Sequence, residues 1–129
     1  MNEFEELINS MDFSFFATGK HKIDAASFLS TQDAVLLDVR SKEETSTIKL
    51  IFNHHLQVIE IPFNELPLNI SQLPNDKFIG VFCSSGVRSA ITFAYLKTKG
   101  FENIKMIEGG YPQLMDAIMP GKLYKQIHK

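Results

Sequence analysis

The sequence predicts an α/β protein built on a central parallel sheet with helices on both faces. Short apolar runs alternate along the chain with segments whose apolar residues recur at helical spacing, which is the order of βαβ units. The clearest unit spans residues 77–100, where a strand-like run, a short loop and a helical pattern follow one another. A chain of 129 residues with 44% hydrophobic and 22% charged residues has the size and composition of one globular domain.

The first twenty residues predict an extension ahead of this domain. Apolar residues at helical spacing indicate an amphipathic helix over residues 3–11: Phe4, Leu7, Ile8 and Met11. The end of the chain is polar and basic. We therefore expect three parts: an N-terminal helical extension (1–20), the α/β domain (21–118) and a polar C-terminal tail (119–129).

The domain begins with short elements. Residues 13–19 predict an extended piece that ends in a turn, and Ile23 a short first strand. Asp24 is a suitable N-cap for a helix over residues 25–29. Residues 34–39 form an apolar run that predicts the next strand.

The remaining elements flank the central unit. Residues 57–62 predict a strand, and residues 66–74, which contain two prolines, predict a loop or a short helical turn. After the central unit, residues 103–107 predict a final short strand. A glycine pair then permits a tight turn into a helix over residues 111–118.

The central unit carries the candidate chemistry. Its strand contains Phe78, Ile79, Val81 and Phe82, a run expected to be covered on both faces. The loop and first helical turn read Cys83-Ser84-Ser85-Gly86-Val87-Arg88-Ser89, and Cys83 is the only cysteine of the chain.

A loop between a parallel strand and a helix directs backbone N–H groups inward, at the positive end of the helix. Together with the charge of Arg88, these groups favour the thiolate form of Cys83. The sequence therefore indicates a nucleophile in a bowl that accepts an anion. The alternative is a buried structural cysteine at a strand end.

The motif strand–Cys-x-x-Gly-x-Arg-Ser–helix resembles the active-site loop of the rhodanese (sulfurtransferase) family. Three further segments are similar to that family, in the same order along the chain. They are Asp38-Val39-Arg40 with Glu44, the stretch 59–66, and Glu108-Gly109-Gly110-Tyr111. The resemblance extends from about residue 22 to residue 114.

This resemblance implies a rhodanese-like fold with a central sheet of about five strands. It implies that Cys83 and Arg88 are catalytic, with Arg88 holding an anionic donor. It assigns substrate binding to the rest of the loop, Ser84, Ser85, Gly86, Val87 and Ser89. It assigns support of the loop to Asp38, Arg40 and Glu44, with an ion pair between Arg40 and Glu44.

The implied reaction transfers a sulfane sulfur through a persulfide on Cys83. The donor would be a small anionic compound such as thiosulfate, and the acceptor cyanide, a thiol or a protein thiol. We expect no cofactor. Two segments depart from the family: residues 48–56 lack its usual glycines, and Tyr111 stands where the family often has tryptophan.

Two other functions remain open at this point. A phosphatase or arsenate reductase also uses a Cys–Arg loop, but those relatives place five residues between Cys and Arg, and here there are four. A non-catalytic or sensor module that binds without chemistry is the second alternative, although many such modules lack the cysteine.

Composition excludes several further classes. One cysteine allows neither an intrachain disulfide nor a Cys-x-x-Cys metal site, and His54-His55 alone does not make one. A formal net charge of −2 gives no reason to expect nucleic acid. No apolar run reaches the ~18 residues that span a membrane. Because the first basic residue is Lys20, we expect no signal peptide and a cytoplasmic protein.

Overall fold

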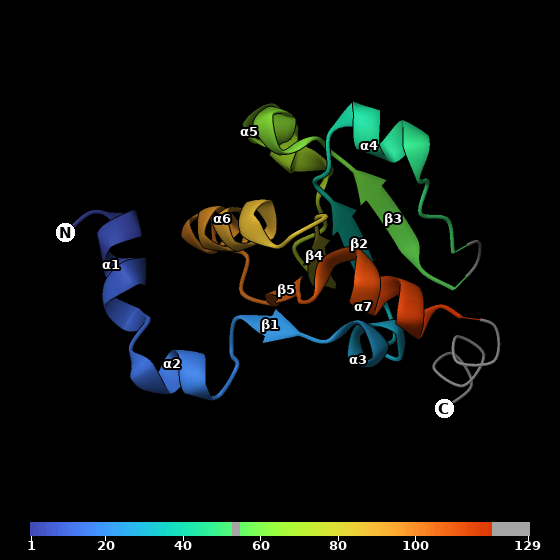
Figure 1. Ribbon diagram of the computed structural model, residues 1–129. Helices are drawn as coiled ribbons and strands as arrows, with labels where there is room; N and C mark the ends of the chain where they lie inside the picture. The colour runs from blue at the N-terminus through green and yellow to red at the C-terminus, as the bar shows by residue number, and fades with distance from the viewer. Residues whose placement is uncertain (53–54, 120–129) are drawn as a thin grey trace.

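The computed structural model of the protein describes residues 1–52 and 55–119. Its five strands form one parallel sheet in the order β1-β5-β4-β2-β3, which confirms the predicted fold (Figure 1). The strands are β1 Lys22–Ile23, β2 Ala34–Asp38, β3 Gln57–Glu60, β4 Phe78–Phe82 and β5 Ile104–Ile107. The central position of β4 places the loop that follows it in the middle of one sheet edge.

Seven α-helices lie among the described residues: α1 Glu3–Ser10, α2 Phe13–Ala17, α3 Ala25–Leu29, α4 Lys42–Thr47, α5 Leu66–Asn69, α6 Val87–Thr98 and α7 Gly110–Ala117. Two short 3-10 helices flank α5, at Phe63–Glu65 and Ile70–Gln72. None of the helices in the described part of the chain is long and apolar enough to cross a membrane.

Each face of the sheet has its own core. Successive residues of a strand point to opposite faces, so Leu37 packs with α6 residues such as Leu96 while Leu36 packs with α3 and α7. Figure 1 shows α6 on one side of the sheet and α3 with α7 on the other. All five residues of β2 are buried, as expected for a strand covered on both faces.

Residues 13–17 form helix α2, so the prediction of an extended piece was wrong there. The carboxylate of Asp12 accepts a hydrogen bond from the backbone N–H of Phe15 at 2.9 Å and caps this helix. The Phe15 ring lies 6.3 Å from the ring of Phe93, and this contact ties α2 to the core beneath α6. The spacing of the phenylalanines in residues 13–17 does not indicate that Asp12 caps a helix here.

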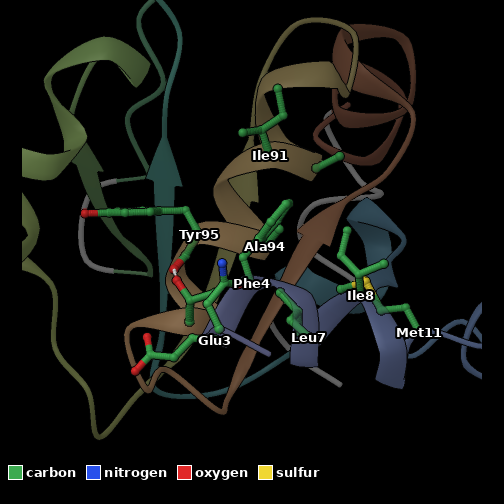
Figure 2. Close-up of a pocket in the computed structure, with 11 residues that line it drawn as sticks. Glu3, Phe4, Leu7, Ile8, Met11, Ile91, Ala94 and Tyr95 are labelled. Carbon is green, nitrogen blue, oxygen red and sulfur yellow. Dashed lines mark hydrogen bonds between the residues drawn. The ribbon is translucent and has the colours of Figure 1, made fainter.

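Residues 3–10 form helix α1, as the amphipathic pattern predicts, and this helix packs across α6. A groove of about 750 Å³ runs between the two helices. Figure 2 shows the side chains of both helices that line this groove, with the ring of Tyr95 pointing to the side away from α1. Phe4 and Ile8 remain 54% and 55% exposed, so α1 covers α6 incompletely.

Two sequence predictions fall partly or wholly outside the described residues. The C-terminal tail lies outside them from residue 120 onward, and so does His54 of the His54-His55 pair. His55 is exposed in a bend before β3.

Candidate active site

Cys83 lies directly after β4, at the carboxyl edge of the sheet. Its side chain is buried, with 1% of the residue exposed. The carbonyl oxygen of Phe82 accepts a hydrogen bond from the N–H of Val39 at 3.0 Å, so the end of β4 is tied to the end of β2. Gly86, with φ +101°, is the N-cap of α6, and a left-handed glycine lets the loop turn sharply into that helix.

Two backbone N–H groups point at the sulfur. Those of Gly86 and Ser89 donate to Cys83 Sγ, at 2.9 Å and 3.4 Å. Burial acts to raise the pKa of the Cys83 thiol, whereas the polar contacts from Ser89, Ser85 and Gly86 lower it, and the net shift is downward. The geometry thus supports a thiolate, as the loop sequence predicts.

The side chain of Ser89 is fully buried near the sulfur. Its hydroxyl acts to lower the pKa of Cys83, although Ser89 Oγ has no hydrogen-bond partner of acceptable geometry within the described part of the chain. The arrangement is a polar contact rather than a formed hydrogen bond. A buried hydroxyl without a partner is costly, so its proton is available to a negatively charged sulfur.

Arg88 reaches from the first turn of α6 to Glu44 in α4. Its Nη1 and Nη2 donate to the two carboxylate oxygens of Glu44, at 2.7 Å and 3.1 Å, and Nη2 also donates to Ser84 Oγ at 2.9 Å. The Arg88 hydrogen bonds, aided by Ser41, lower the pKa of Glu44 to about 2 in spite of burial. Arg88 therefore connects the Cys83 loop, through Ser84, to Glu44 of α4.

Arg40 is fully buried and pairs with Asp38, not with Glu44 as the resemblance implied. Its Nε and Nη2 donate to the Asp38 carboxylate, at distances from 2.7 to 3.1 Å. Residues two apart on an extended chain share a face, which brings these two side chains together. Glu44 instead caps α4 and pairs with Arg88.

Tyr111 completes the buried network around Arg40. Arg40 Nη1 donates to the Tyr111 hydroxyl at 2.9 Å, and the guanidinium carbon lies 5.5 Å from the Tyr111 ring centre. Hydrogen bonding to Asp38 and Tyr111 raises the pKa of Arg40 although burial opposes this. Tryptophan, which is donor-only, could not accept this bond. The sequence shows tyrosine at this position but gives no sign of its partner.

The Cys83 loop also touches the start of α7. Gly110 has φ +56°, and a Cβ added there would collide with the backbone carbonyl of Ser84. A glycine is therefore required where α7 meets the loop. The network of Asp38, Arg40 and Tyr111 holds this part of α7 in place.

The remaining predicted residues lie at the mouth of the loop. Ser85 is exposed and acts on the sulfur through its backbone, and Val87 is 66% exposed. Within residues 1–52 and 55–119, no three His, Cys, Asp or Glu side chains are grouped so as to hold a metal ion. The site thus offers a thiol whose pKa is lowered, inward N–H groups and a paired arginine, which suit covalent chemistry at sulfur.

A parallel sheet with a buried cysteine in the loop after its central strand defines a class of α/β domains that carry a cysteine at the carboxyl edge of the sheet. Within that class, the chain belongs to the rhodanese-like domain family, whose family model matches residues 23–117.

Several relatives carry names that describe sulfur chemistry. The tRNA sulfurtransferase of Actinobacillus succinogenes is 38% identical over 90 residues, which is 70% of this chain and 18% of that protein. The chain therefore spans less than a fifth of the length of the curated relatives it matches.

Solved structures of other proteins are also similar to this chain. A rhodanese-related protein from Thermoplasma volcanium has a TM-score of 0.61 at 28% identity, covering 78% of this chain and 95% of that one. A NAD-dependent persulfide reductase from A. fulgidus has a TM-score of 0.59 at 30% identity, covering 84% of this chain and 22% of that one.

Proposed function

We propose that this protein is a sulfurtransferase that carries a sulfane sulfur on Cys83 as a persulfide. The observation that carries this proposal is the pair of backbone N–H groups that donate to Cys83 Sγ. They stabilise a buried thiolate at the N-terminus of α6. The names of its relatives support the same class of reaction.

The first step forms the persulfide. The Cys83 thiolate attacks the outer sulfur of a donor such as thiosulfate, the S–S bond of the donor breaks, and sulfite leaves with the electron pair. The inward N–H groups of Gly86 and Ser89 stabilise negative charge at this position.

The second step removes the outer sulfur from the Cys83 persulfide. A thiol or cyanide attacks the outer sulfur of the persulfide and regenerates the Cys83 thiolate. Because the chain has one cysteine, no internal thiol can take this sulfur, and the acceptor must come from outside. The cycle needs a reduced thiol, so we place it in a reducing compartment such as the cytoplasm.

Intact mass spectrometry tests this function. Treatment with a panel of sulfane donors and no acceptor should add one sulfur atom to the wild-type chain, and cyanide should remove it. Cys83→Ala, which should stay folded, is the control and should gain no sulfur. If no donor loads protein whose Cys83 is reduced and can be alkylated, the chain is a binding module rather than a sulfurtransferase.

A further inference from the structure

The charge of Arg88 is compensated inside the protein. Both Nη atoms donate to Glu44, and the second also donates to Ser84 Oγ. The side chains of Arg88 and Glu44 are each 29% exposed, so the ion pair lies at the mouth of the site rather than in bulk water. A donor that approaches Cys83 therefore meets a neutral pair and not a free cation.

Glu44 is held in this position by its own helix. Its carboxylate accepts hydrogen bonds from the backbone N–H and from the hydroxyl of Ser41, both at 3.0 Å. Glu44 is thus the N3 residue of a capping box whose N-cap is Ser41. With a pKa of about 2, Glu44 stays ionised wherever a cysteine is reactive. Releasing Arg88 to an incoming anion would break the pair and leave this carboxylate without its cation.

No other side chain of the loop supplies positive charge. Arg88 is the one charged residue between positions 83 and 89. The buried guanidinium of Arg40 is compensated by Asp38. Ser85 and Val87 are exposed beside the Cys83 loop. Ile91, 51% exposed, follows Val87 one turn along α6.

These charges distinguish between classes of sulfur donor. Thiosulfate brings two negative charges to a thiolate whose neighbouring cation, Arg88, is already paired with Glu44 in the described part of the chain. An organic persulfide brings an organic group R that can be uncharged and can lie against Val87. We propose that the site selects an organic persulfide without net negative charge on its organic part, in preference to thiosulfate; this rests on the sulfurtransferase function proposed above.

The exchange balances without a further reactant. The Cys83 thiolate attacks the outer sulfur of R–S–SH, forming a new S–S bond while the S–S bond of the donor breaks. The leaving group R–S⁻ takes the electron pair and is then protonated. The products are the Cys83 persulfide and the thiol R–SH, and no oxidant or reductant is used.

Glu44→Gln tests the proposal, because glutamine also fits the capping box and can accept from Arg88, yet it removes the compensating charge. The measurement is kcat/KM for loading Cys83 from thiosulfate and from hydroxyethyl persulfide, whose organic part carries no charge. Wild-type protein should prefer the persulfide. Glu44→Gln should raise the ratio of the thiosulfate value to the persulfide value about tenfold, the scale expected when one negative charge is removed several ångströms from a dianion in a water-like dielectric.

Glu43→Gln is the matched control, since it removes an equal charge from the exposed neighbouring position of α4. It should leave the ratio of the two donors as in the wild type. Comparing two donors on one variant also removes any general loss of folded protein from the result.

A second measurement does not need sulfur transfer. Sulfate should protect Cys83 from iodoacetamide weakly in the wild type and strongly in Glu44→Gln. An equal preference for both donors, with no change of ratio and no gain of protection in Glu44→Gln, would overturn the inference while sulfur loading still supported a sulfurtransferase. Absence of loading from every donor would instead overturn the function, and sulfate protection would then decide alone whether Glu44 controls the entry of anions.

Discussion

Arg40 and Tyr111, 71 positions apart in sequence, are joined by a hydrogen bond of 2.9 Å from guanidinium Nη1 to the phenolic oxygen. This bond links the end of β2 to the first turn of α7, and α7 in turn contacts the Cys83 loop through Gly110. Because Arg40 is fully buried, water is not available to replace the tyrosine oxygen.

Tyr111→Phe should therefore destabilise the protein by about 1–3 kcal/mol, since it leaves a buried charged donor without its acceptor. Urea unfolding measures this difference. Tyr95→Phe is the control: it also removes one hydroxyl, from a partly buried tyrosine on α6 for which no side-chain hydrogen bond is seen in the described structure. Equal stability of Tyr111→Phe and wild-type protein would show that the bond contributes nothing.

The sequence predicted the sheet and the nucleophilic loop because both have local signals. Apolar runs placed β2 and β4, and the residues from Cys83 to Arg88 lie within one strand–loop–helix unit. The pairing of Arg40 with Glu44 was wrong because the choice of partner depends on where α4 places Glu44. Two local signals pointed to the observed pairs: Asp38 and Arg40 are two apart on an extended chain, and Ser41 with Glu44 forms a capping box.

Other features had no local signal. The Arg40–Tyr111 hydrogen bond joins segments that are distant in sequence, and neither segment carries a sequence signal that indicates the other as its partner. The need for glycine at position 110 arises from the Ser84 carbonyl, which only the folded chain brings close. Helix α2 was missed because its Asp12 cap outweighs the aromatic, strand-like composition of residues 13–16.

Gly110→Ala should disturb both the stability of the protein and the reactivity of Cys83. The added methyl group would meet the Ser84 carbonyl, so either α7 or the loop must move. Gly100→Ala is a matched control, because Gly100 also has a positive φ, +91°, but has no atom within 4 Å of the added group.

The control should therefore lose only about 1–2 kcal/mol from the left-handed backbone. Chemical unfolding together with iodoacetamide kinetics separates the two variants: only Gly110→Ala should change the rate at Cys83. If both variants behave alike, contact with the loop is not what requires glycine at position 110.

Alkylation of Cys83 by iodoacetamide should be half-maximal at a lower pH than for a free cysteine, because the polar contacts lower the thiol pKa in spite of burial. The rate follows the thiolate fraction, so a lower pKa moves the whole profile to lower pH. Ser89→Ala should move it back upward by removing the buried hydroxyl beside the sulfur.

Thr92→Val controls for Ser89→Ala, since Thr92 Oγ1 is also buried on α6 and has no partner within the described residues. Both variants remove a buried hydroxyl, but only the first lies next to Cys83. A profile that Ser89→Ala leaves in place, or that Thr92→Val shifts equally, would mean that the serine hydroxyl does not stabilise the thiolate.

The Arg88–Glu44 pair should contribute to stability in a defined pH window. Glu44 has its pKa lowered in the folded state, mainly by hydrogen bonding to Arg88, from 4.5 to about 2. A lowered carboxyl pKa stabilises the folded state fully above the unfolded pKa, and this contribution is lost as the pH falls through the folded pKa. Wild-type protein should therefore be more stable than Glu44→Gln above pH 4.5, and the difference should shrink between pH 4.5 and about 2.

Urea unfolding of the two proteins across this range measures the difference, and comparing them removes the contribution of all other carboxylates. Glu43→Gln should show no such window, since its side chain is exposed on the same turn and no ion pair of it is seen in the described structure. A difference between wild type and Glu44→Gln that stays constant down to pH 2 would show that the charge of Glu44 is not what ties α4 to the Cys83 loop. In that case the neutral hydrogen bonds to Ser41 and Arg88 would be sufficient to hold it.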